Sequence, residues 1–115
     1  MRSFLQAMRA RDGDTLLQAF SKSKPFVITE ASARKPMKVA PKTFATGLRP
    51  GGDYRGIMFG DDDLDCFRTN VVREVNWVQR KPLTFEPEDD AGSGVFVRWA
   101  KEGARYVVTE MGFYF

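Results

Sequence analysis

The chain has 115 residues, a formal net charge of +3, a single cysteine and no histidine. This length suits one domain over residues 1–115, which can bury enough apolar surface to fold without disulfides or metal ions. The lack of histidine excludes Ser-His and Cys-His catalytic pairs and histidine-ligated zinc, and the lone Cys66 excludes an internal disulfide. Any catalysis would therefore depend on carboxylates, Tyr, Lys or Arg.

Basic residues are concentrated in the first half of the chain. Residues 1–55 hold eleven basic and four acidic side chains, whereas residues 56–115 hold seven basic and eleven acidic ones. Weak nucleic-acid binding through Arg34, Lys35, Lys38 and Lys42 is therefore one functional hypothesis. We place it third, because acidic side chains are abundant elsewhere in the same domain and nucleic-acid binding needs a concentrated basic surface.

The N-terminal region predicts two helices and a strand. Apolar residues fall on one helical face over residues 3–10 and again after Asp14, which is a suitable N-cap for the second helix. Residues 24–30 (KPFVITE) are typical of a short strand, and residues 31–40 (ASARKPMKVA) predict a polar, basic loop. The N-terminal stretch lacks the apolar centre of a signal peptide and no apolar run is long enough to span a membrane, so the protein is expected in the cytoplasm or exported after removal of an upstream segment.

The middle of the chain predicts a short helix and a second strand. Pro41 suits the first turn of a helix in which Phe44 and Leu48 share one face, and the turn sequence Pro50-Gly51-Gly52 ends it. Residues 54–59 (YRGIMF) predict a strand.

The acidic residues 61–65 (DDDLD) have two interpretations. Asp61, Asp63 and Asp65 match the first three ligand positions of a calcium loop, but Cys66 replaces its glycine and Val72 replaces its closing glutamate. Asp61 or Asp62 would instead cap a helix whose first turn favours negative charge. We therefore predict a helix start and no metal site.

Residues 71–79 (VVREVNWVQ) are rich in β-branched and aromatic residues, which is typical of a strand, although Phe67, Val71 and Val75 also keep helical spacing. We predict a short helix that passes into a strand near Asn70. A weaker strand is expected at residues 82–86 (PLTFE), and residues 87–94 (PEDDAGSG) predict an exposed loop. Gly92-Ser93-Gly94 lacks the strand-to-helix setting of a phosphate-binding loop, so no cofactor is predicted.

The strongest local signal is a C-terminal hairpin around Lys101-Glu102-Gly103. A three-residue turn would divide the strand residues between two faces. The core face would hold Val95, Val97, Trp99, Val107, Thr109 and Met111. The other face would hold Phe96, Arg98, Tyr106, Val108 and Glu110. A two-residue turn would regroup these sets, so both registers stay open.

The order of the predicted elements resembles the nuclear-transport-factor-2-like, or SnoaL-like, superfamily. The resemblance rests on RARDGDTLLQAF at residues 9–20, then a strand, a short helix and strands that end in FVRWAKEGARYVVTEM at residues 96–111. It implies a cone-shaped α+β fold with N-terminal helices packed on a curved antiparallel sheet, an internal cavity and dimers formed through the sheet. Enzymes of the superfamily place an acid or a Tyr in that cavity, whereas the acids of this chain gather at turns and helix starts.

These observations favour a noncatalytic domain that binds a small apolar ligand or a protein partner. The predicted ligand-binding residues are Tyr54, Trp77, Arg98, Tyr106 and Glu110, with core packing as the alternative for the aromatic members. The second hypothesis is an isomerase, lyase or hydrolase that uses Glu110, Glu74 or Tyr106 for proton transfer and Arg98 to stabilise negative charge. A homodimer is expected from the apolar ending MGFYF, because an exposed apolar edge strand is a liability.

Overall fold

In the part of the chain that the structure describes, five helices pack against a six-stranded sheet, which confirms the predicted α+β class. The structure is a computed structural model that describes residues 1–30, 35–60, 66–73, 76–88 and 94–113. The predictions for the acidic residues 61–65 and for most of the loop at residues 87–94 lie outside these ranges. The described helices are α1 (Arg2–Ala10), α2 (Gly13–Leu17), α3 (Pro41–Gly47), α4 (Asp53–Met58) and α5 (Phe67–Arg73).

The sheet has the strand order β2-β1-β6-β5-β4-β3. Its strands are β1 (Phe26–Glu30), β2 (Lys35–Val39), β3 (Trp77–Lys81), β4 (Thr84–Pro87), β5 (Phe96–Glu102) and β6 (Arg105–Phe113). Neighbouring strands are antiparallel except β1 and β6, which run parallel with Ile28 opposite Met111. The sheet is therefore mixed, and the expectation of an antiparallel sheet was wrong, because alternation of apolar residues reports which face is buried and not the direction of the neighbouring strand.

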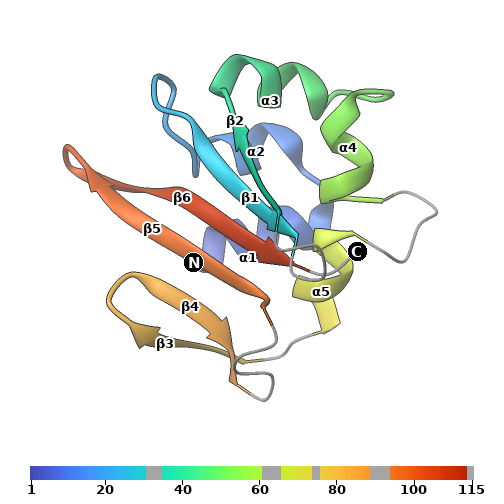
Figure 1. Ribbon diagram of the computed structural model, residues 1–115. Helices are drawn as coiled ribbons and strands as arrows, with labels where there is room; N and C mark the ends of the chain where they lie inside the picture. Colours follow the sequence, from blue (N-terminus) through green and yellow to red (C-terminus); the bar gives the residue numbers. More distant parts are fainter. Residues whose placement is uncertain (31–34, 61–65, 74–75, 89–93, 114–115) are drawn as a thin grey trace.

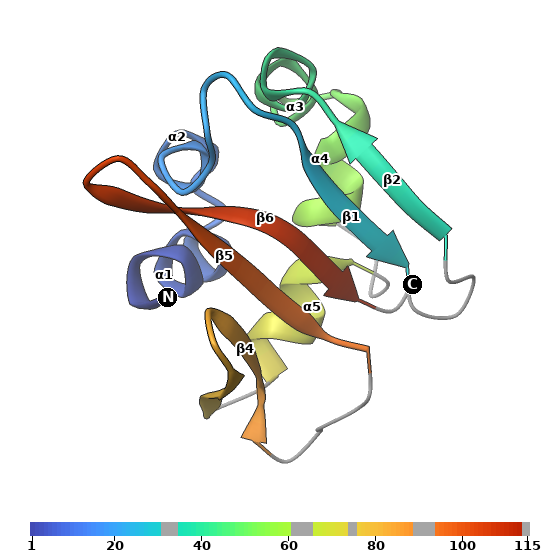
Figure 2. The same ribbon diagram turned by 60° about the vertical axis from the view of Figure 1, so that its left-hand side comes forward.

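The helices bury one face of the sheet. Figure 1 shows α1 and α2 behind the central strands, and Figure 2 shows α1 and α5 on the same side of β5 and β6. Phe4 and Met8 from α1, Phe67 from α5, and Ile28 and Met111 from the central strands are among the residues of one continuous core. Burial of these large side chains provides most of the driving force for folding.

The start of α2 differs from the prediction by two residues. Asp12, not Asp14, caps the helix: the Thr15 backbone N–H donates to Asp12 Oδ1 at 3.1 Å and the Thr15 hydroxyl donates to Asp12 Oδ2 at 2.6 Å. The chain reverses between α1 and α2 at Arg11, whose φ of 53° places it in the left-handed region. Two short helices, rather than one long helix, therefore follow the N-terminus.

Two segments adopt a different structure from the one their sequences predicted. Residues 35–39, expected in a loop, form the edge strand β2, and Pro36 and Lys38 are exposed on it. Residues 54–58, expected in a strand, lie in the helix α4. Tyr54, Ile57 and Met58 have helical spacing, and all three pack in or against the core.

Helix α5 extends to Arg73, past the predicted change to a strand near Asn70, and β3 begins only at Trp77. Phe67 and Val71, which are four residues apart and fully buried, anchor α5 on the core. The predicted strand at residues 82–86 is confirmed as β4, which reaches Pro87, and the helix beginning at Pro41 is confirmed as α3.

The C-terminal hairpin has a two-residue turn, Gly103-Ala104, between the paired residues Glu102 and Arg105. Gly103 adopts a φ of 62°, which suits glycine at a tight turn. A bulge then places Arg98 opposite Glu110 but Trp99 opposite Val108, so that Thr109 is the additional residue on β6. This register excludes the three-residue turn and changes which side chains share a face.

Candidate ligand-binding cleft

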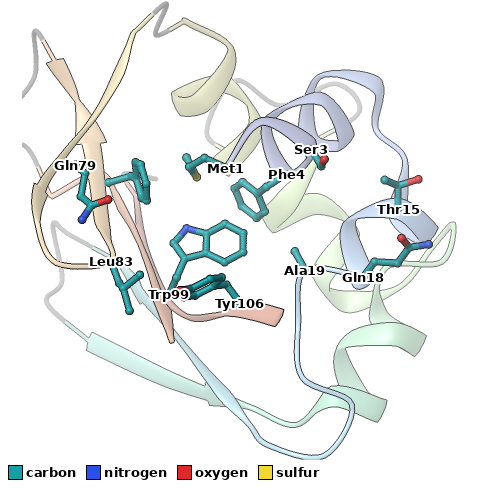
Figure 3. A pocket seen from close by; sticks show the side chains of 11 residues that line it. Met1, Ser3, Phe4, Thr15, Gln18, Ala19, Gln79, Leu83, Trp99 and Tyr106 are labelled. Carbon is teal, nitrogen blue, oxygen red and sulfur yellow. The ribbon is translucent and has the colours of Figure 1, made fainter. Parts of the chain in front are cut away.

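A cleft in the described part of the chain lies between the first two helices and the inner face of the sheet, and it has a volume of about 670 Å³. The helical wall is formed by Met1, Ser3, Phe4, Thr15, Gln18 and Ala19. The sheet wall is formed by Gln79, Leu83, Phe85, Trp99 and Tyr106. Figure 3 shows Trp99 and Tyr106 side by side at the centre of the cleft, with Phe4 close to the indole.

The bulge in β6 brings Tyr106 into this cleft. Without it, strict alternation from Glu110 would place Tyr106 and Val108 on the same face as Arg98. The additional residue Thr109 reverses the alternation, so Val108 joins the core and Tyr106, two residues away, lines the cleft. The predicted grouping of Tyr106 and Val108 with Arg98 and Glu110 was therefore wrong.

Trp99 forms the floor of the cleft. Its ring contacts Phe4 in an edge-to-face arrangement, with centroids 5.8 Å apart and planes at 79°. The indole is half-buried and packs against the core, as the sequence predicted with Val95 and Val97. Its Nε1 atom is buried, yet no acceptor is found for it among the described residues.

The polar groups of the cleft are neutral side chains. Gln79 lies on the sheet side, whereas Ser3, Thr15 and Gln18 lie on the helical side. None of the described lining residues carries a charged side chain. Burial also lowers the pKa of the Met1 amino group, which disfavours a positive charge there. The cleft is open, because its polar side chains and Tyr106 are exposed to solvent. It can therefore contact an apolar molecule and direct a few hydrogen bonds to it, and none of the described lining residues places a carboxylate next to that molecule.

Of the predicted ligand-binding residues, only Tyr106 lines this cleft. Trp77 lies on the same face of the sheet but packs against the core outside the lining residues. Tyr54 is on α4, where its ring is 5.7 Å from that of Phe44. Tyr54, Trp77 and Tyr106 thus lie in three different environments, and only Tyr106 lies in the cleft.

Arg98 and Glu110 lie on the opposite face of the sheet. Arg98 Nη1 is 2.8 Å from Glu110 Oε1, and the Thr29 hydroxyl donates to Glu110 Oε2 at 3.1 Å. The guanidinium of Arg98 also lies 5.4 Å from the centroid of the Phe96 ring. We call Thr29, Phe96, Arg98 and Glu110 the outer-face cluster. Its polar groups satisfy one another, which is the arrangement expected of a structural cluster.

The remaining predicted residues are not brought together with the cleft. Glu74 and Arg34 lie outside the described residues, as does the side chain of Lys35. Lys38 and Lys42 are exposed on β2 and α3, at the far end of the sheet from β3 and β4. No group of three potential metal ligands was found in the described ranges, which do not include residues 61–65.

The sequence interpretation missed Phe4, Gln79 and Phe85 as cleft residues. Gln79 and Phe85 are cross-strand partners on β3 and β4, and Phe85 in turn pairs with the buried Val97 of β5. Side chains alternate between the two faces along residues 77–81 and 84–87. This alternation was the sequence signal that would have placed both side chains on the inner face.

Comparisons with protein-family models, with curated proteins and with solved structures found no match. None of the helices in the described ranges combines the length and the apolar character that crossing a membrane requires.

Proposed function

We propose that the protein is a noncatalytic domain that binds a small apolar ligand in the cleft between α1, α2 and the inner face of the sheet. The observation that carries this proposal is the combination of volume and lining. A volume of about 670 Å³ falls within the range of roughly 300–1,000 Å³ that is typical of small-molecule sites. Aromatic walls with a few neutral polar groups are likewise typical of such sites.

A SnoaL-like architecture is part of the same proposal. Its support is the order of elements: paired N-terminal helices, a strand, a short helix, and later strands that end in a long hairpin, with a cleft between the helices and the sheet. Fold alone does not define function, so this likeness adds a place for the ligand and not a reaction.

The proton-transferring enzyme has less support. Tyr106 lines the cleft, but Glu110 and Arg98 bind each other on the opposite face of the sheet. A general base must reach the proton that it removes, either directly or through one water molecule. Glu110 is therefore poorly placed to act on a molecule held in the cleft.

A matched pair of variants tests the binding proposal. N-phenyl-1-naphthylamine, a neutral dye that fluoresces in apolar surroundings, should bind saturably with one molecule per chain. Ala19→Phe places a large ring in the cleft and should weaken binding at least about tenfold. Ala10→Phe adds the same ring at an exposed position of α1 and should leave binding unchanged. Absence of saturable binding, or equal binding by both variants, would contradict the proposal.

The homodimer stays a prediction, but the apolar ending MGFYF no longer supports it. Met111 and Phe113 are fully buried in the core, so the described part of the apolar C-terminal ending does not form an exposed edge. The outer face of the sheet, with Val27, Phe96 and the outer-face cluster, is the surface that a second copy would cover. Light scattering at micromolar concentration tests this prediction, and a monomeric mass would count against it.

A further inference from the structure

Three arginines line a second cleft, which lies on another side of α2 and has a volume of about 400 Å³. Arg11 follows α1, Arg49 lies in the turn after α3, and Arg55 lies in α4. Figure 1 shows α3 and α4 side by side at one end of the helical layer. The fold therefore brings guanidinium groups from separate parts of the sequence to one place, which we call the arginine cleft.

The protein positions two of these arginines by contacts that leave most of their donors free. Arg55 Nη1 donates to the Leu48 carbonyl at 3.2 Å, and its guanidinium lies 4.9 Å from the centroid of the Phe59 ring. The backbone of Arg49 is fixed in its turn, where its carbonyl accepts from the Gly52 N–H at 2.8 Å. A guanidinium group has five N–H donors, so both side chains can donate further hydrogen bonds into the cleft.

The positive charges of the arginine cleft are only partly balanced. None of the ion pairs in the described ranges includes any of its three arginines. Asp12 and Asp14 also line the cleft, but both carboxylate oxygens of Asp12 accept hydrogen bonds from Thr15. Cationic groups around one cleft repel one another, and an anion bound between them replaces this repulsion by charge-assisted hydrogen bonds. The cleft is therefore suited to an anionic group.

We propose that the arginine cleft binds the phosphate group of a small organic molecule. The paired N–H donors of a guanidinium group match the geometry of phosphate oxygens. A phosphate monoester carries a charge of about −1.5 to −2 at pH 7 and three acceptor oxygens, so it can meet several guanidinium groups at once. The organic part of the ligand lies against Leu17, Ala45 and Leu48, which line the same cleft. This site does not depend on the apolar ligand proposed above, because the two clefts share no lining residue that carries either argument.

Three small anions test the ligand class. Calorimetry at constant ionic strength should show that phenyl phosphate binds saturably with one molecule per chain. Benzoate has the same ring but a single charge, and it should bind at least about fivefold more weakly. Inorganic phosphate lacks the ring and should also bind more weakly than phenyl phosphate. If inorganic phosphate binds as tightly, the organic part of the proposal is overturned, and if benzoate does so, phosphate recognition is overturned.

Matched charge variants test the position of the site. Arg49 is exposed and belongs to none of the described ion pairs, so Arg49→Gln should keep the fold and weaken phenyl phosphate binding at least about fivefold. Arg2→Gln is the control, because it removes the same charge at an exposed position roughly 13 Å from Arg11 along α1, beyond the screening length at 0.1 M salt. Asp14→Asn removes a carboxylate from the cleft and should strengthen binding about twofold or more.

Each outcome supports or contradicts the proposal. Absence of saturable phenyl phosphate binding overturns it, and so do equal effects of Arg49→Gln and Arg2→Gln. If Arg49→Gln does not fold, Asp14→Asn decides, and an unchanged or lower affinity of that variant contradicts the proposal. Ala19→Phe fills the first cleft and should leave phenyl phosphate binding unchanged, whereas a loss in this variant would place the ligand in the first cleft.

Discussion

The phenyl ring of Phe96 lies directly over the backbone of Gly112, its cross-strand partner on the outer face of the sheet. A Cβ atom at position 112 would collide with this ring and with the carbonyl oxygen of Gly94. Glycine is therefore required at position 112, because only glycine lets the Phe96 ring pack directly on the backbone there. The ring shields this backbone from solvent in place of a side chain. The guanidinium of Arg98 in turn lies over the Phe96 ring, which links this contact to the outer-face cluster.

The first prediction is that Gly112→Ala lowers the free energy of unfolding by about 1 to 3 kcal/mol, because the added methyl group must displace both a packed ring and a backbone oxygen. Denaturant melts measure the change. Gly56→Ala is the control: Gly56 lies in α4 with open space around it, so this variant should be more stable by about 0.5 to 1 kcal/mol. Equal effects of the two substitutions would show that the Phe96 contact is unimportant.

The parts of the fold that the sequence predicted well are those with long, regular patterns. The hairpin of β5 and β6 was predicted because two apolar strands flank a glycine, and α3 was predicted because Phe44 and Leu48 share a helical face. Residues 54–58 were misassigned because an apolar stretch this short fits either a strand or a helix. Only the spacing of Tyr54, Ile57 and Met58 distinguishes the two, and that spacing is helical.

The edge of the sheet and its bulge were harder to predict. The segment that forms β2 contains lysines and a proline, which are typical of a loop. Edge strands carry the same residues, because they prevent pairing with a strand of another molecule. The bulge at Thr109 reverses alternation without a distinctive residue type. Tyr106 was thus predicted on the wrong face of the hairpin. The buried Nε1 atom of Trp99 had no signal in the sequence, since the hydrogen bonding of a buried donor depends on tertiary contacts.

The second prediction concerns stability in acid. Hydrogen bonds from the Thr15 side chain and backbone hold the pKa of Asp12 below its ordinary value of 3.8. Because the folded-state pKa is the lower one, the stabilising contribution of Asp12 is complete above the ordinary pKa and is lost as the pH falls through the folded-state pKa. Thr15→Val removes the larger of these causes, so its melting temperature should fall less steeply with acidification than that of the unmodified protein.

Thermal melts between about pH 6 and pH 2 measure this difference. Thr43→Val, at an exposed position of α3, is the control and should keep the acid dependence of the unmodified protein. If Thr15→Val and the unmodified protein lose stability in parallel, Asp12 does not contribute to acid sensitivity in this way.

The third prediction is that residues 61–65 bind no structural calcium. Cys66 and Val72 replace two residues that a calcium loop requires, so the folded protein should gain no binding energy from the ion. A ligand that binds only the folded state must raise the melting temperature. Melts in millimolar calcium and then in excess chelator should therefore coincide, and a calcium-dependent rise of several degrees would contradict the capping interpretation.

The last prediction contrasts neighbours on the two faces of β5. Trp99 contacts Phe4 and the core on the inner face, so Trp99→Ala should lower the free energy of unfolding by about 3 kcal/mol, a large fraction of the stability of a small domain. Arg98 on the outer face pairs with Glu110, but their side chains are 47% and 25% exposed, and solvent screens such pairs. Arg98→Ala should therefore cost less than about 1 kcal/mol, and the cost should shrink in high salt.

Denaturant melts of both variants at low and high salt distinguish the two effects, because the loss at Trp99 is a packing effect that screening does not reduce. Glu110→Gln is the control for the ion pair and should resemble Arg98→Ala in both size and salt dependence. A small effect of Trp99→Ala would remove Trp99 from the core and weaken the case for a rigid cleft floor. A loss at Arg98 as large as that at Trp99 would instead make the outer-face cluster a main determinant of stability.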